Sequence, residues 1–270
     1  MTHRRLLSTA LLLCLAASPL AAEDRYACVI DPSREVDLGS SVAGLIERIA
    51  VDRGAWVEKG DLVATLSADS ERATVALLRA RAESEAEVAA QAARERLARQ
   101  GYDRARRLLD QGIGTLEALE EREVALEVAR RDRAEADLRR TLAQLELRRA
   151  RIALAQREIR APISGFVTMR HLDEGEYLHP ELALLTISQL DPLYVEAFVD
   201  ARVYAEVAEG SVAMVHPSSI EAAPREAVVT VVDRVLDATS DTFGVRLELP
   251  NPDYAIPAGQ RCEVAFPAPG

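Results

Sequence analysis

The fold is decided by residues 69–158, which contain no proline and read DSERATVALLRARAESEAEVAAQAARERLARQGYDRARRLLDQ to residue 111, then GIG, then TLEALEEREVALEVARRDRAEADLRRTLAQLELRRARIALAQRE from residue 115. Both long segments consist mostly of Ala, Leu, Arg and Glu, which are strong helix formers. Glycine occurs in them only at Gly101, Gly112 and Gly114. The stretch therefore predicts two helices of about forty residues each, joined by a short turn near residue 113.

Apolar side chains recur at spacings of three and four along both predicted helices. They are Ala82, Ala86, Ala89, Ala93 and Leu97 on the first helix, and Val124, Val128, Leu138, Leu142, Leu145, Ile152 and Ile159 on the second. Each set forms a narrow stripe, which is typical of the seam of a coiled coil. We therefore expect an antiparallel coiled-coil hairpin with arms roughly 60 Å long and with these residues in its seam.

The charge of the chain is distributed unevenly. The hairpin segment is nearly neutral, with 19 Arg against 18 Asp and Glu, so the net charge of −11 comes from the other residues. No nucleic-acid partner is expected for so acidic a protein. Many hairpin charges lie three or four residues apart, as in Arg81 with Glu85, which is typical of a solvated helix surface.

The chain begins with the features of a secretory signal peptide, which we assign to residues 1–22. Arg4 and Arg5 precede an apolar run, and small residues lead up to Ala22. The run has about 12 residues, which is short for a membrane span of about 20. We expect export with cleavage near Ala22; acylation at Cys14 and an uncleaved anchor are the alternatives.

Residues 36–68 and 159–188 repeat one pattern of short strands and glycine turns. At an offset of 121 residues the corresponding positions are Gly44 and Gly165, Gly54 and Gly175, Val57 and Leu178, and Leu66 and Ile187. Neither copy has enough apolar surface to fold alone, so we expect the two to pair into one small β-sandwich. The hairpin of residues 69–158 is then an insertion between the two halves.

This split sandwich resembles a lipoyl or biotinyl domain, and its specific form is similar to the membrane fusion proteins, the HlyD-like and RND-type periplasmic adaptors. The resemblance rests on SVAGLI at residues 41–46, VEKGDL at 57–62, IRAPISGFV at 159–167 and EGEYL at 174–178. Arg160-Ala161-Pro162-x-x-Gly165 is the strongest marker. The resemblance implies an α+β multidomain protein: a long antiparallel α-helical coiled-coil hairpin inserted in a lipoyl-like β-sandwich, plus a small β-barrel domain.

The resemblance assigns the β-barrel to residues 23–35 and 189–270. Alternating patterns predict strands at residues 193–199, 227–235, 243–249 and 261–266, and a short helical stretch at residues 201–207. Asn251-Pro252-x-x-x-Ile256-Pro257 resembles the turn before the last barrel strand of the adaptors. Since the chain stops about four residues after that strand, we expect no fourth, membrane-proximal domain.

Two other kinds of site are weighed and set aside. A carrier domain holds its modified lysine where the two halves join, but the hairpin occupies that junction here and Lys59 is the only lysine. His171 and His179 flank three acidic residues, as metal ligands can, but their stretch aligns with the ordinary turn at residues 52–58. We therefore expect a solvated loop there, and neither a catalytic centre nor a cofactor.

The hairpin tip carries the predicted functional site. Residues 102–115, YDRARRLLDQGIGT, resemble the Arg, Leu, Ser motif by which adaptors bind a TolC-type outer-membrane channel, with matches at Arg104, Leu108 and Thr115. Thr115 departs from the motif but keeps the hydroxyl. Arg104 and Leu108 lie one turn apart, and an exposed Ile113 has no core to enter. The alternative is that Leu108 packs in the seam and Thr115 only caps the second helix.

Cys28 and Cys262 are the cysteines of the mature chain, and each alternates with apolar residues of an expected strand. The resemblance implies that the first and last strands of the mature chain meet in the barrel. Because exported proteins fold in an oxidising compartment, we expect a disulfide between the two. The alternative is a pair of buried free thiols in the same core.

The resemblance implies a non-enzymatic periplasmic adaptor of a tripartite efflux pump, associated with the inner membrane. Its implied partners are an inner-membrane transporter, with the RND type favoured, a TolC-type channel, and further copies of itself in a ring of six. The alternatives are an adaptor of an ABC-type exporter or type I secretion system, and an envelope coiled-coil scaffold without a transport role. If the protein is a transport adaptor, the transporter selects the substrate, so the adaptor sequence does not identify the substrate.

Overall fold

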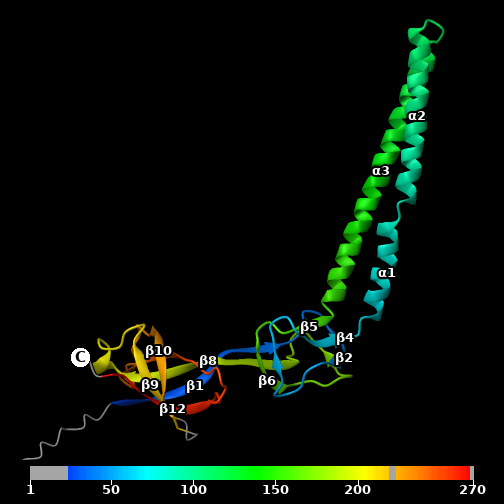
Figure 1. The fold of residues 1–270 in the computed structure, drawn as a ribbon. Helices are drawn as coiled ribbons and strands as arrows, with labels where there is room; N and C mark the ends of the chain where they lie inside the picture. Colours follow the sequence, from blue (N-terminus) through cyan, green and yellow to red (C-terminus); the bar gives the residue numbers. More distant parts are fainter. Residues whose placement is uncertain (1–23, 219–222, 268–270) are drawn as a thin grey trace, which may run out of the picture. The chain divides into compact units, whose positions relative to one another are not determined.

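The computed structural model of the protein describes residues 24–218 and 223–267 (Figure 1). The signal peptide predicted at residues 1–22 lies outside the described residues. Among the described helices, none combines the length and the apolar character that a membrane span needs. The described chain divides into two compact units, one formed by residues 34–189 and the other by residues 24–33 together with 190–267.

The second of these units is a β-barrel. Its strands are β1 (Arg25–Leu38), β8 (Leu185–Asp200), β9 (Val212–Pro217), β10 (Arg225–Val232), β11 (Thr242–Leu249) and β12 (Gln260–Ala265). They pair in the order β1-β12-β9-β10-β11-β8, and β8 pairs with β1 as well, which closes the ring. Alternate residues point inward, so Val195, Val199, Val245 and Leu247 are fully buried in the barrel core.

The barrel strands follow the predicted alternation with two differences. Strand β9 was not predicted, because its sequence VAMVHP is short and ends in a histidine and a proline. The helical stretch expected at residues 201–207 is reduced to one turn of 3-10 helix, η1 (Ala201–Val203). Asp200 caps this turn by accepting a hydrogen bond from the backbone N–H of Arg202 at 2.9 Å.

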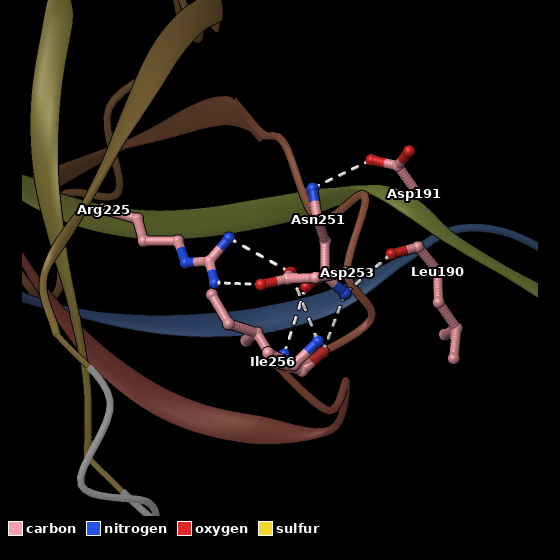
Figure 2. Close-up of polar contacts among 7 residues, drawn as sticks. Leu190, Asp191, Arg225, Asn251, Asp253 and Ile256 are labelled. Atoms are coloured by element: carbon pink, nitrogen blue, oxygen red, sulfur yellow. Dashed lines mark hydrogen bonds and ion pairs between the residues drawn. The ribbon is translucent and has the colours of Figure 1, made fainter.

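The turn before β12 is organised by Asn251, which is completely buried (Figure 2). Its side-chain amide donates to the carbonyls of Leu190 and Ile256 at 3.0 and 2.9 Å, and its side-chain oxygen accepts from the N–H of Ile256 at 3.1 Å. The Asn251 N–H donates to Asp191 at 2.8 Å. The bonds to Leu190 and Asp191 tie the loop after β11 to β8, and the two bonds with Ile256 close the loop on itself.

The first unit contains the sandwich, whose remaining strands are short. They are β2 (Gly44–Ile49), β3 (Trp56–Val57), β4 (Leu62–Leu66), β5 (Glu158–Arg160), β6 (Gly165–Arg170) and β7 (Tyr177–Leu178). The core includes Ile46, Leu66, Leu178 and Ile187, all essentially without exposed surface. Both copies of the sequence repeat contribute to this core.

The predicted repeat is confirmed by how the strands pair. Strand β2 of the first copy pairs with β7 of the second, and β3 of the first pairs with β6 of the second. Gly54 and Gly175, at corresponding positions, both have φ of +86°, a conformation that glycine adopts without strain. The Gly54 N–H donates to the Val167 carbonyl at 2.8 Å, and the Gly175 N–H donates to the Ile46 carbonyl, at the position corresponding to Val167, at 2.9 Å.

Between β4 and β5 the chain forms a helical hairpin (Figure 1). Helices α1 (Asp69–Glu83) and α2 (Ala86–Asp110) make the first arm, and α3 (Leu116–Ala155) makes the second. The prediction of one continuous first helix was wrong, since the chain leaves helical geometry at Ser84, where φ and ψ are −70° and 120°. Ser is a modest helix former whose side chain competes for backbone hydrogen bonds. Because the residues on both sides of Ser84 are strong helix formers, the sequence did not indicate that the helix breaks there.

The predicted seam was also wrong. On α3 the buried residues are Leu126, Ala129, Ala136, Leu147 and Ala150, whereas the predicted Val124, Val128, Leu138, Leu142, Leu145 and Ile152 are exposed. On the first arm Ala82 is buried as expected, but Ala86, Ala89, Ala93 and Leu97 are exposed. Ile159 lies in β5 and is buried in the sandwich core. The seam of α3 thus contains more alanine than the residues we expected there.

Candidate docking site at the hairpin tip

The tip turn is closed around the carbonyl oxygen of Leu108. That oxygen accepts hydrogen bonds from the N–H groups of Ile113 at 3.1 Å and Gly114 at 3.0 Å. Gly112 has φ of +78°, and a Cβ on Gly114 would lie 2.8 Å from the nitrogen of Leu109. Both glycines are therefore required, one for its backbone angle and the other for its close approach to α2.

Thr115 begins the second arm as the N-cap of α3. Its hydroxyl oxygen accepts a hydrogen bond from the N–H of Ala118 at 3.2 Å, which satisfies one of the free donors of the first helical turn. The capping role that we considered for Thr115 is thus present in the structure. A hydroxyl has a second lone pair and a proton, so capping leaves it able to bind a partner.

An open groove of about 650 Å³ runs between α2 and α3 just below the turn. Arg104, Leu108 and Thr115 all line it, so three of the four predicted tip residues border one hollow. Small residues, among them Gly101 and Ala105, line it as well. The sequence analysis missed these two residues, although their spacing of four along α2 marks a helix face without bulky side chains.

Leu108 and Ile113 present apolar surface to solvent at the tip. Leu108 is 39% exposed and Ile113 is 72% exposed, so neither is a residue of the seam. The seam position beside Leu108 belongs to Leu109, which is less exposed. Ile113 does not line the groove but lies on the turn beyond it. Leu108 thus borders both the groove and solvent, and its docking role stays a prediction.

The guanidinium of Arg104 is available to a partner. Among the ion pairs of the described residues none includes Arg104, whereas Arg99 in the same helix pairs with Glu95 at 3.2 Å. Glu95 also accepts from Arg133 of α3 at 3.0 Å, and this hydrogen bond is the main reason that the pKa of Glu95 lies below its usual value. The arms are thus tied together below the tip by a charged cluster that leaves Arg104 free.

The other predicted residues are not part of the tip. Cys28 on β1 and Cys262 on β12 are directly opposite in register, and a disulfide of 2.07 Å joins their sulfur atoms. His171 contacts the hydroxyl of Thr186 at 2.9 Å, while His179 packs its ring edge-on against Tyr177. In the described part of the chain no group of three or more His, Cys, Asp or Glu could hold a metal ion.

Comparison with known proteins identifies the family. Residues 34–189, more than half of the chain, match the family described as CzcB-like, barrel-sandwich hybrid domain. The cation efflux system protein CzcB of Alcaligenes sp. (strain CT14) is 26% identical over 221 residues, which are 79% of this chain and 39% of CzcB. The nickel-cobalt-cadmium resistance protein NccB of Alcaligenes xylosoxydans xylosoxydans is 30% identical over 182 residues, 67% of this chain and 42% of NccB.

A solved structure shares the fold. The crystal structure of MacA from Actinobacillus actinomycetemcomitans matches with a TM-score of 0.78 and 21% identity, covering 91% of this chain and 79% of the MacA chain. This chain spans about two fifths of the length of the two curated relatives. The resemblance to membrane fusion proteins is thereby confirmed, and the chain belongs to the CzcB-like barrel-sandwich hybrid family.

Proposed function

We propose that this protein is a non-enzymatic periplasmic adaptor that links an inner-membrane transporter, of the RND type, to a TolC-type outer-membrane channel. The observation that carries the proposal is the groove at the hairpin tip, which Arg104, Leu108 and Thr115 line together. A cationic side chain that forms no ion pair with the described residues, an exposed apolar side chain and a hydroxyl form a mixed surface that suits a protein partner. The named relatives, which are efflux and resistance proteins, support the same role.

The proposal extends to location and assembly. The signal sequence expected at residues 1–22 supports delivery to the periplasm, where the adaptor associates with the inner membrane. The family implies a ring of six copies around the export path. The transporter selects the substrate, and the cations named for CzcB and NccB are the first candidates to test.

The proposal is tested by substituting Arg104→Asp. A carboxylate at this position removes the free cation and introduces the opposite charge into the contact, which reduces binding by about 2–5 kcal/mol if the charge is buried against the channel. We expect loss of export and of cross-linking between tip and channel, with unchanged helicity and secretion. Arg106→Asp is the matched control, because Arg106 is exposed on the same helix but does not line the groove.

Unchanged export and unchanged channel cross-linking in the Arg104→Asp variant would contradict the docking role. That result would favour the alternative of an envelope scaffold, for which the tip sequence is immaterial. The transporter class is decided separately, by the reading frames beside the gene. A multispanning permease of the RND type agrees with the proposal, whereas an ATP-binding transporter would assign the adaptor to an ABC-type exporter or a type I secretion system.

A further inference from the structure

The contact between α2 and α3 is only weakly apolar. No side chain of α2, a helix that the structure describes in full, is buried. Of the buried residues of α3, Leu147 and Ala150 pack in the cluster with α1, which leaves Leu126, Ala129 and Ala136 for the contact with α2. Because the hydrophobic contribution grows with the apolar area removed from water, such small side chains do little to determine which side of α2 faces α3.

Both helices carry a second face that is more apolar than the seam. Its members are exposed: Ala86, Ala89, Ala93 and Leu97 on α2, and Val124, Val128 and Leu138 on α3. Leu97 lies two positions from Glu95 and Val128 lies two positions from Leu126, which corresponds to about 200° around a helix. Half a turn of both arms about their axes would therefore join these faces and bury the larger side chains. Since hydrophobic burial favours that rotated arrangement, a different interaction has to select the observed one.

Glu95 makes a contact that exists only in the observed arrangement. Its side chain is 13% exposed, and its carboxylate accepts hydrogen bonds from Arg133 of α3 at 3.0 Å and from Arg99 at 3.2 Å. Arg130 of α3 lies at 4.0 Å. Half a turn of both arms would carry the carboxylate and Arg133 to opposite sides of the hairpin. Rotation of the arms therefore breaks this contact.

The burial of Glu95 makes this contact selective. A carboxylate that is held largely out of water is stable only while neighbouring cations balance it, and single polar residues of this kind determine the register of coiled coils. The pair of Glu87 and Arg139 also joins the arms, but its side chains are 52% and 54% exposed, so water screens the attraction. Among the ion pairs of the described residues that join the two arms, those of Glu95 lie nearest the tip.

The place of Glu95 in α2 connects it to the docking groove. Arg104 lies about 13 Å further along the helix, at 1.5 Å per residue. Because α2 is one uninterrupted helix from Ala86 to Asp110, the rotation that is fixed at Glu95 also fixes the direction of Arg104 and Leu108. These two residues line the groove together with Thr115. Half a turn of α2 about its axis would move both of them out of the groove.

We propose that Glu95 is a positioning residue that selects which side of α2 faces α3, and so assembles the groove of Arg104, Leu108 and Thr115. The selection stands on the contacts of Glu95 alone, whereas its consequence for channel docking rests on the proposed function. A cation in place of Glu95 brings four positive side chains together in the observed arrangement. It should therefore shift the hairpin to its other apolar pairing without loss of helix.

Thiol cross-linking of the purified full-length protein measures which arrangement is present. Dibromobimane joins only adjacent thiols, and the product is counted within a single chain. Cys28 and Cys262 do not react, because they are joined to each other.

Two cysteine pairs report the two arrangements. A98C/A129C reports the observed one, since both positions lie on the less exposed sides of their helices and the ion pair of Glu95 with Arg133 places them level. L97C/V128C reports the rotated one. Leu97 and Val128 line different grooves, so this pair should not be joined in a chain that keeps Glu95.

Glu95→Arg should change the two products in opposite directions. We expect the A98C/A129C product to fall about tenfold or more, a shift of about 1.4 kcal/mol in the equilibrium between the arrangements, and the L97C/V128C product to appear. Helicity measured by circular dichroism should persist, because Arg and Glu are both good helix formers. Glu95→Gln, which keeps the shape but not the charge, should act in the same direction to a smaller extent.

A rescue and a matched control separate positioning from a general effect of charge. E95R/R133E exchanges the two charges and should restore the A98C/A129C product. Glu87→Arg places the same new charge on the same helix, but the pair of Glu87 with Arg139 is exposed. It should therefore leave both products unchanged.

Two results would overturn the inference. One is an unchanged A98C/A129C product in Glu95→Arg. The other is a loss of helicity without the L97C/V128C product, because Glu95 would then contribute to stability alone.

Cross-linking of the tip to the channel in cells separates this inference from the proposed function. We expect Glu95→Arg to lose the channel contact and Glu87→Arg to keep it. If Glu95→Arg rotates the arms and the tip still reaches the channel, the groove is not the docking site and the proposed function is refuted. If Arg104→Asp loses the channel contact while Glu95→Arg leaves the arms unrotated, this inference is refuted and the proposed function stands.

Discussion

Asn251 is the residue on which the end of the barrel depends. Replacing it with Ala removes the three side-chain hydrogen bonds and leaves the Leu190 and Ile256 groups without these partners. We expect Asn251→Ala to lower the free energy of unfolding by about 2–4 kcal/mol, because each buried group left unsatisfied costs about 1–3 kcal/mol. Guanidinium unfolding followed by far-ultraviolet circular dichroism measures the change.

The neighbouring pair of Arg225 and Asp253 is the control for that prediction (Figure 2). It joins exposed parts of the same region at 2.7 Å, and ion pairs of this kind contribute about 0–1 kcal/mol. Arg225→Ala should therefore have a much smaller effect than Asn251→Ala. Equal effects would mean that the buried amide does not organise the turn.

Asp200 should titrate at unusually low pH. The side chain of Arg202 donates to its carboxylate at 2.9 and 2.8 Å, and with the backbone N–H of Arg202 this lowers the pKa of Asp200 from 3.8 to about 2. Because the folded pKa is depressed, the stabilising contribution is complete above 3.8 and is lost as the pH falls toward 2. Carbon-detected NMR titration measures this pKa.

Arg202→Ala should move the pKa of Asp200 upward, toward that of an ordinary aspartate. Arg261→Ala serves as a control, since Arg261 is not among the groups that shift the pKa of Asp200. An Asp200 that titrates at its ordinary value in the unaltered protein would show that the guanidinium contact does not form in solution.

For single residues, the sequence predicted where a turn or a groove residue lies, but it did not predict which distant residues that turn contacts. The motif around Asn251 identified the turn, and the spacing of Arg104, Leu108 and Thr115 identified three residues of one groove. The hydrogen bonds of Asn251 to Leu190 could not be predicted, because they join segments about 60 residues apart and depend on how the barrel closes. A local sequence motif predicts the geometry of a turn, but it does not predict which distant segment the turn contacts in the folded protein.

Among the elements, the two halves of the sandwich offer a direct comparison. Gly54 and Gly175 occupy corresponding turns with the same positive φ, and neither would place a Cβ against another atom. Substitution by Ala should therefore cost only the backbone strain, about 1–2 kcal/mol at each site. Urea unfolding of Gly54→Ala and Gly175→Ala should give two values that agree within experimental error.

Gly165→Ala is the informative contrast, since its Cβ would lie 2.4 Å from the carbonyl oxygen of Ser188. That backbone clash should destabilise the sandwich more than either turn substitution. A large difference between the Gly54 and Gly175 variants would contradict the structural equivalence of the repeat.

The helices show why hydrophobic periodicity misled the analysis. The seam of α3 includes the small residues Ala129, Ala136 and Ala150, which carry a weak apolar signal. The strongest stripe, with Leu138 and Leu142, is on the other side. Periodicity finds an apolar face but does not say what covers it, so a helix with two such faces gives an ambiguous pattern.

For the whole molecule, the disulfide between Cys28 and Cys262 links the first described strand to the last. It closes a loop with a sequence separation of 234 residues, which in the chain-entropy model corresponds to on the order of 5 kcal/mol of stabilisation. We expect Cys28→Ser/Cys262→Ser to melt at a clearly lower temperature, with the loss concentrated in the barrel. Calorimetry of the oxidised and variant proteins measures the difference.

The bond itself is checked by mass spectrometry of an unreduced digest of the exported protein. A linked pair of peptides containing Cys28 and Cys262 is the expected product. Quantitative alkylation of both thiols in unfolded, unreduced protein would instead support the alternative of two free cysteines.

The hairpin begins and ends on paired neighbours, because β4 and β5 form an antiparallel pair in which Thr65 lies opposite Glu158. The hairpin is therefore attached to the sandwich only through the ends of β4 and β5, and the length of the hairpin does not change this attachment. In evolution, equal seven-residue blocks can be added to or deleted from both arms while the ends stay in place and the heptad phase is kept. A lineage could in this way match its adaptor to an envelope of different depth by in-frame changes alone, with no compensating mutation in the sandwich.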